Sequence, residues 1–79
     1  MTRRSDALVR PVSISKEPVE LYKILKFEGL APSGAEAKAA IDAGAVTVNG
    51  VVETRRRKKI VSGDVIAFDG ETLQIVLAP

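Results

Sequence analysis

Cysteine and histidine are both absent from the 79 residues of this sequence. Their absence excludes disulfides, zinc sites built from thiolate and imidazole, thiol nucleophiles and imidazole general bases. The acids Asp64, Asp69 and Glu71 lie in or beside Gly-Asp and Asp-Gly turns, where short acids bond their own backbone. We therefore predict no catalytic residue, no metal site, no cofactor and no small-molecule substrate. Because small secreted domains usually need disulfides, we also expect a cytoplasmic protein.

Aromatic residues and long apolar runs are also scarce. Aromatic residues make up 4% of the chain, and Tyr22, Phe27 and Phe68 lack the alternate-residue spacing of a strand that stacks bases. Phe27 and Phe68 are expected to lie in the core. No apolar stretch approaches the ~18 residues of a membrane span. Arg10 and Pro11 interrupt the only apolar residues near the basic start, so we expect neither membrane insertion nor a signal peptide.

The length of the chain suits one small domain. Hydrophobic residues make up 46% of it, which exceeds their share in disordered chains, so the domain should fold unaided. Residues 1–10 are expected to form a flexible basic arm, and residues 11–79 a single domain. Val12 and Ile14 alternate with serines, a pattern typical of a short edge strand.

The first of two predicted helices follows this strand. Pro18 suits the first helical position, where its missing N–H costs nothing. Leu21, Ile24 and Leu25 form an apolar stripe at helical spacing. Gly29 is expected to end this helix.

The second predicted helix begins at a capping box. The Ser33 hydroxyl is expected to accept a bond from the Glu36 amide, while the Glu36 side chain returns to the Ser33 amide. Gly44 supplies a left-handed residue after the helix, which ends near Ala43. Lys38 should point away from the buried face. That face should consist of Ala37, Ala40 and Ile41.

Two hairpins are predicted after the helices. Asn49-Gly50 within Val46–Val52 supplies the positive dihedrals of a tight turn, although the register stays open because Val51 and Val52 cannot both face inward. The second hairpin should join Val65–Phe68 to Thr72–Leu77 at Asp69-Gly70. The fold class is therefore α+β, with two packed helices against a small, mostly antiparallel sheet of about four to five strands.

Positive charge is concentrated in one segment, the basic run, which consists of five consecutive cations: Arg55, Arg56, Arg57, Lys58 and Lys59. Without it, 7 Lys and Arg residues face 10 Asp and Glu residues. Like charges at this density repel one another, and an external polyanion would relieve the repulsion. Apolar segments flank the run on both sides, which favours an anchored phosphate-binding patch over a solvated loop.

The orientation of the basic run follows from its expected backbone. In an extended chain alternate side chains diverge, so Arg55, Arg57 and Lys59 should point together, away from Arg56 and Lys58. A second, weaker basic surface is expected on the helices, where lysines lie near the free amides at the start of the second helix. Its candidate residues are Lys23, Lys26, Ser33, Gly34 and Lys38.

Several short motifs follow one another in a familiar order. They are Leu21-x-x-x-Leu25, Gly29-Leu30-Ala31, Ser33-Gly34-x-x-Ala37, Ile41-x-x-Gly44-x-Val46-x-Val48-Asn49-Gly50 and Gly63-Asp64-x-Ile66. This pattern resembles the αL-type RNA-binding domain of the small-subunit ribosomal protein uS-four, which RNA pseudouridine synthases and tyrosyl-tRNA synthetases share. The segments Ser33–Lys38 and Glu53–Ile60 look like the small free-standing bacterial members of this family, the YbcJ type.

The resemblance implies an RNA-binding surface formed by the paired helices and the adjoining strand loop, with no catalytic domain attached. Two positions depart from the family pattern. Gly34 stands where many members carry Arg, and Glu20-Leu21-Tyr22 stands where many have Arg-Leu-Asp. Both changes remove a cation from the helices, which shifts the expected RNA contact toward the basic run.

These observations predict a non-catalytic, monomeric module that grips structured RNA, ribosomal RNA or tRNA, through its phosphates. The basic run and the helix face would supply the contacts. Two alternatives stay open, namely a protein-interaction adaptor that docks an acidic or ribosomal partner, and a DNA-binding protein. Salt dependence separates the first alternative, because phosphate-led binding weakens log-linearly with salt.

Overall fold

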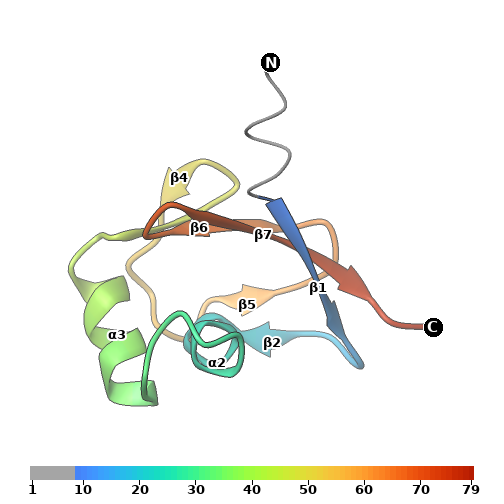
Figure 1. The fold of residues 1–79 in the computed structure, drawn as a ribbon, viewed down its shortest axis with the longest axis horizontal. Helices are drawn as coiled ribbons and strands as arrows, with labels where there is room; N and C mark the ends of the chain where they lie inside the picture. The colour runs from blue at the N-terminus through green and yellow to red at the C-terminus, as the bar shows by residue number, and fades with distance from the viewer. Residues whose placement is uncertain (1–8) are drawn as a thin grey trace.

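The computed structural model describes residues 9–79 (Figure 1). Most of the predicted basic arm, residues 1–8, lies outside the described residues. Val9 and Arg10 depart from that prediction, because they begin strand β1 (Val9–Ile14). This strand pairs in parallel with β7 (Glu71–Leu77), from Val9 opposite Thr72 to Ile14 opposite Leu77. This pairing places Val9 and Arg10 in the domain instead of in the expected arm.

Five strands form the larger sheet in the order β1-β7-β6-β3-β4, with β3 at Val46–Val48, β4 at Val51–Val52 and β6 at Val65–Phe68. Its β1–β7 pair is parallel, and its other pairs are antiparallel. A smaller sheet pairs β2 (Val19–Glu20) with β5 (Lys59–Ile60). The predicted α+β class and mostly antiparallel sheet are confirmed, and the small sheet is an addition.

Two tight turns connect the antiparallel strands as predicted. Asn49 and Gly50 have φ values of 54° and 83°, and Val48 stands opposite Val51. Asp69 and Gly70 repeat this geometry between β6 and β7, with φ values of 53° and 81°. The register of the first hairpin leaves both residues of β4 exposed, which settles the position of its valines.

The first helix, α2 (Leu21–Phe27), begins later than predicted. Pro18 is not its first residue, because the next two residues pair with β5 before the chain turns into the helix. Leu21, Ile24 and Leu25 are buried, which confirms the apolar stripe. Gly29, at φ 77°, closes the helix, and its amide donates to the Lys26 carbonyl at 3.1 Å.

The second helix, α3 (Gly34–Asp42), has the predicted ends. Ser33 Oγ accepts the Glu36 amide at 3.2 Å, although the return bond of a full capping box is absent from the described part of the chain. Gly44, at φ 78°, donates to the Ile41 carbonyl, and Ala45 donates to the Ala40 carbonyl at 3.1 Å. These two bonds form the Schellman motif expected at a glycine-terminated helix.

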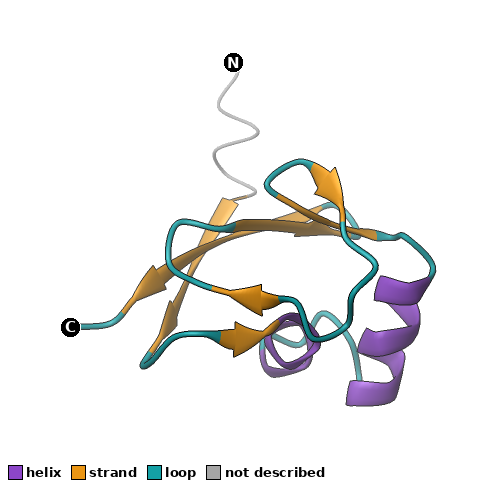
Figure 2. Ribbon diagram, turned by 180° about the vertical axis from the view of Figure 1, so that it is seen from behind, coloured by secondary structure: helices purple, strands orange, loops and turns teal. Residues whose placement is uncertain are grey.

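Both helices and the small sheet lie on the same side of the larger sheet (Figure 2). The core fills the space between these layers, where Leu21, Ile41, Ile66 and Ile75 are fully buried. Phe68 packs against the core only partly. Phe27 is 68% exposed, so its predicted place in the core is wrong.

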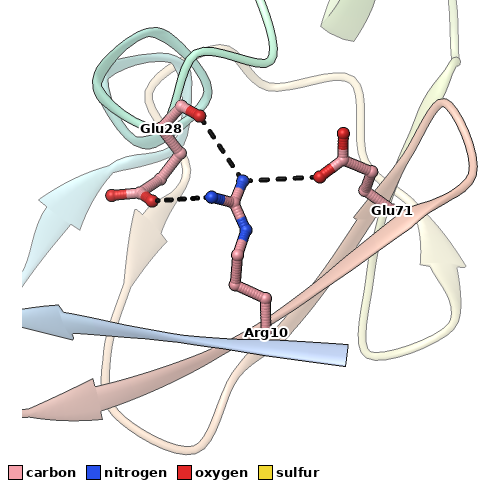
Figure 3. A network of polar contacts seen from close by, with 3 residues as sticks. All are labelled: Arg10, Glu28 and Glu71. Atoms are coloured by element: carbon pink, nitrogen blue, oxygen red, sulfur yellow. Dashed lines mark hydrogen bonds and ion pairs between the residues drawn. The ribbon is translucent and has the colours of Figure 1, made fainter. Parts of the chain in front are cut away.

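Arg10 connects three elements on one side of the domain (Figure 3). Its guanidinium lies 3.4 Å from a Glu71 carboxylate oxygen and 3.6 Å from a Glu28 carboxylate oxygen, and it also faces the Glu28 carbonyl. These contacts link β1 to the end of α2 and the start of β7. Arg10 is therefore engaged within the domain, and it is not a free cation of an arm.

Candidate nucleic-acid interface

The basic run is not extended along its length. Arg56 and Arg57 form a turn in which the Lys58 amide donates to the Arg55 carbonyl at 3.1 Å, and β5 begins only at Lys59. The predicted alternation of side chains depends on an extended backbone, so it is wrong for this segment. Which of these cations can contact an external anion therefore depends on the ion pairs that each one forms within the protein.

The backbone of the basic run caps the start of helix α2. Glu20 occupies the N-cap position without a side-chain bond. The amides of Leu21 and Tyr22 instead donate to the carbonyls of Lys58 and Arg56, at 2.9 and 3.2 Å. Because the first amides of a helix need partners from outside it, these bonds hold the run against the first turn of α2. The run is thus an anchored loop, as its apolar flanks predicted.

Arg56 forms a two-pronged pair with Asp42, the last residue of α3. Its Nε and Nη2 atoms lie 3.1 and 2.7 Å from the two carboxylate oxygens. A carboxylate at a helix C-terminus is unfavourable next to the negative end of the helix dipole, and the guanidinium offsets this. Hydrogen bonding from Arg56 lowers the pKa of Asp42, and the same bonds raise the pKa of Arg56.

Arg55 is held by Glu53 in a similar way. Its Nε and Nη2 atoms lie 2.9 and 3.1 Å from the two carboxylate oxygens, and its backbone amide adds a bond of 3.0 Å. The side-chain bonds and then the amide bond lower the pKa of Glu53 to about 2. The Glu53 side chain is 12% exposed, whereas that of Arg55 is 70% exposed. The guanidinium therefore keeps donors facing solvent while its charge is matched.

The remaining three cations of the run are not matched in this way. Arg57, Lys58 and Lys59 form no ion pair with any residue in 9–79. Arg57 and Lys59 are exposed, and Lys58 is half-buried. The excess positive charge that the sequence places in five residues is thus concentrated at the end of the run.

The three candidate lysines of the helices lie in two separate places, Lys38 on α3 and the other two on α2. Lys38 lies on α3 with its Nζ 4.6 Å from the centre of the Tyr22 ring. It precedes Asp42 by one helical turn, so it lies on the same face as the Arg56 pair. Lys23 instead lies 3.7 Å from Glu20, and Lys26 Nζ is 5.8 Å from the centre of the Phe27 ring.

The candidate residues at the start of α3, Ser33 and Gly34, offer an RNA few free side-chain groups. The Ser33 hydroxyl is occupied by the Glu36 amide. Gly34 has no side chain, but a Cβ built there would lie 3.8 Å from the Tyr22 ring, which is an ordinary contact distance. The position therefore has room for a larger residue, such as the Arg that many family members carry.

A groove on α2 brings together residues that the sequence analysis did not connect. Lys16, Lys23, Phe27 and Lys59 are among the residues that line it. Lys16 and Phe27 were not among the candidate site residues. Local patterns cannot find this group, because its members come from the β1–β2 connection, α2 and β5. An exposed aromatic residue beside lysines becomes visible only after folding.

Other kinds of site find no support within residues 9–79. The described side chains contain no cluster of acidic residues able to hold a metal ion. None of the described helices is long and apolar enough to cross a membrane. Every buried side-chain nitrogen or oxygen described has a hydrogen-bond partner.

The chain is similar to known proteins in both sequence and fold. The S4 domain family matches residues 12–76. YbcJ of Escherichia coli (strain K12), to which RNA binding is ascribed, is 52% identical over 65 residues, or 81% of this chain and 93% of YbcJ. RlbA of Bacillus subtilis (strain 168), to which a role in ribosome maturation is ascribed, is 33% identical over 63 residues, or 80% of this chain and 89% of RlbA.

A solved structure of one of these relatives is similar to the fold of this chain. The solution structure of E. coli YbcJ, described as revealing an αL motif involved in RNA binding, matches this fold with a TM-score of 0.65 and 47% identity. The match covers 96% of this chain and 95% of that one. These similarities confirm the resemblance to the YbcJ type and point to a non-enzymatic protein, as predicted. The chain belongs to the S4 domain family.

Proposed function

We propose that this protein is a non-catalytic RNA-binding module that grips structured RNA, ribosomal RNA or tRNA, through its phosphates. Membership of the S4 domain family and the roles ascribed to YbcJ and RlbA support this proposal. The observation that carries it is the basic run, whose backbone is fixed to the start of α2 while Arg57 and Lys59 stay exposed and unmatched within the described chain.

The proposed grip has two parts. Arg57 and Lys59 of the basic run supply unmatched charge, and Arg55 and Lys58 lie beside them. Lys38 extends this surface along α3, and Arg56 lies beside it, paired with Asp42. Lys26, Ser33 and Gly34 complete the expected helix face, and Lys23 lies toward the groove. Such a surface recognises the shape and charge of a folded backbone, because phosphate contacts position an RNA without reading its sequence.

We further infer that the protein acts in the cytoplasm as a monomer and serves ribosome assembly. The role ascribed to RlbA supports the last part. Residues 1–8 include two arginines, which would add charge as a basic arm beside the domain.

The test is a binding titration with a ribosomal RNA hairpin at several salt concentrations. Phosphate-led binding should lose affinity log-linearly with salt, with a slope of roughly 0.7–0.9 per phosphate contact. A duplex DNA of the same sequence and an acidic peptide serve as competitors. Equal affinity for DNA would favour a general nucleic-acid binder, and preference for the peptide would favour a protein adaptor.

Gly34→Arg tests the helix part of the grip by gain of function. The position has room for a side chain, and the added cation would stand at the start of α3. We expect tighter RNA binding and a salt slope steeper by about 0.7–0.9. Gly34→Gln is the matched control, because it adds bulk without charge. Equal binding by the two variants would exclude the start of α3 from the interface.

A further inference from the structure

One flank of helix α2 carries a groove that shares only Lys23 and Lys59 with the proposed phosphate grip. It encloses about 520 Å³ between α2, the β1–β2 connection and the small sheet. Lys23 and Phe27 line it from α2, one turn apart on the same flank. The neighbouring Tyr22 instead contacts Lys38 of α3. The groove therefore lies on a different flank of α2 from the α2–α3 contact.

Phe27 gives the groove an exposed aromatic ring. It is 68% exposed, whereas the other large apolar side chains of α2 and the small sheet are buried or half-buried. Its contact with Lys26 Nζ, at 5.8 Å, is near the outer limit of a cation–π interaction, so an approaching ring can displace the ammonium. Pro18 and Val19 add apolar surface beside it. Such a platform suits a flat aromatic ligand.

The charge of the groove limits what that ligand can be. Lys16, Lys23 and Lys59 line it together with one acid, Glu20. Glu20 lies 3.7 Å from Lys23, while Lys16 and Lys59 form no ion pair with residues 9–79. The groove thus combines a net positive charge with an apolar, aromatic wall. A nucleotide has the complementary pair of features, a phosphate and a base.

We propose that this groove receives an unpaired nucleotide of the bound RNA, with its base against Phe27 and its phosphate among the lysines. This inference rests on the proposed RNA-binding function. Lys59 belongs both to the basic run and to the groove, so it connects the two surfaces. The preferred RNA would then be a helix with an unpaired nucleotide next to it, because a fully paired helix offers no free base to stack.

The experiment compares a blunt RNA duplex with the same duplex bearing a short unpaired overhang. The native protein should bind the overhang duplex more tightly. Phe27→Leu keeps apolar bulk but removes the aromatic face, so it should weaken binding to the overhang duplex by roughly 5- to 150-fold, the range for one stacked base. It should leave binding to the blunt duplex unchanged. Phe27→Tyr is the matched control and should bind both RNAs like the native protein.

A spectroscopic readout supports the same comparison. The chain contains no tryptophan, so Phe27→Trp places a single reporter in the groove. The overhang duplex should quench its fluorescence, and the blunt duplex should not. Because Phe27 is largely exposed, all three variants should melt like the native protein.

The outcomes separate the two proposals. If the native protein binds both duplexes equally and Phe27→Leu changes neither, the nucleotide groove is wrong while RNA binding stands. If no RNA binds even at low salt, the proposed function fails and this inference fails with it. If Phe27→Leu weakens binding of an acidic peptide and of neither RNA, the groove accepts a protein segment and the inference is overturned.

Discussion

Arg56 and Arg57 are adjacent and chemically identical, yet the fold treats them differently. Arg56 lies 2.7 Å from a carboxylate oxygen of Asp42, whereas Arg57 has no ion-pair partner within residues 9–79. The same contrast separates Arg55, held by Glu53, from Lys59. A run of like charges in a sequence therefore does not give the charge that a ligand meets. Within residues 9–79, the first two cations of the run have carboxylate partners and the last three have none.

The contrast has a direct electrostatic consequence. A phosphate that approaches Arg56 also approaches the carboxylate of Asp42, so attraction and repulsion partly cancel. At Arg57 no carboxylate of residues 9–79 lies within ion-pair distance, so this opposition is weaker. The pairs are exposed to solvent, so the cancellation is incomplete, and salt screens both effects. We expect the end of the run to dominate RNA affinity.

Among changes to these ion pairs and cations, the largest expected effect comes from Arg57→Gln. Loss of one productive phosphate contact should lower the salt slope by about 0.7–0.9, which corresponds to roughly 5- to 8-fold in affinity across a tenfold change in salt. The loss should be similar for all RNA sequences, because phosphate contacts carry no sequence information. Binding to a ribosomal RNA hairpin at several salt concentrations measures both quantities.

The matched control for this variant removes the whole Arg56 pair. Asp42→Asn/Arg56→Gln leaves the net charge unchanged, so it should leave the affinity and the salt slope nearly unchanged. If the double variant loses as much affinity as Arg57→Gln, Arg56 contacts phosphate despite its carboxylate. The two halves of the run would then be equivalent.

A smaller effect of opposite sign is expected from Asp42→Asn alone. The substitution releases Arg56 from its partner, so RNA affinity should rise by roughly 2- to 5-fold, the range expected from an exposed ion pair. Asp69→Asn is the control, since it removes the same charge from a turn without an ion pair in the described structure, and Asn tolerates its φ of 53°. Equal gains from both variants would show that only the net charge matters.

Features governed by local rules could be predicted from the sequence. The buried stripe of α2 follows from side-chain spacing, and the turns at Asn49-Gly50 and Asp69-Gly70 follow from the positive φ values that their residue types favour. The end of α3 follows from Gly44 in the same way. In each case the neighbouring residues alone determine the conformation.

Features that depend on distant partners could not be predicted. Pro18 suits a helix start, but pairing of Val19–Glu20 with β5 delays the helix until Leu21. Asp42 reaches Arg56 only because the loop is fixed to α2. The extended backbone assumed for the basic run was overridden by the same attachment.

Two misses could have been avoided from the sequence itself. Glu53 is two residues from Arg55, close enough to suggest a local pair. The stripe Leu21, Ile24 and Leu25 continues at position 28, so a strict helical pattern places Phe27 outside it. Treating Phe27 as core because it is apolar ignored this spacing, although the groove that it lines becomes visible only after folding.

The smallest expected effect is a pH-dependent loss of stability in Glu53→Gln. The folded-state pKa of Glu53, about 2, lies below its ordinary value of 4.5, so its pair with Arg55 stabilises the fold above pH 4.5 and loses this contribution as the pH falls toward 2. Because Arg55 is largely exposed, the native protein should melt only a few degrees above the variant at pH 7.

Thermal melts of the native protein and Glu53→Gln between pH 7 and pH 2 test this directly. The gap in melting temperature should narrow steadily below pH 4.5, because protonated Glu53 no longer attracts the guanidinium. Asp69→Asn, which removes an acid of a turn outside any described ion pair, should show no such narrowing. A gap that persists unchanged at pH 2 would mean that Glu53 acts through packing. Arg55 would then owe its position to the loop backbone instead of to a charge partner, and the distinction between matched and free cations would apply to Arg56 alone.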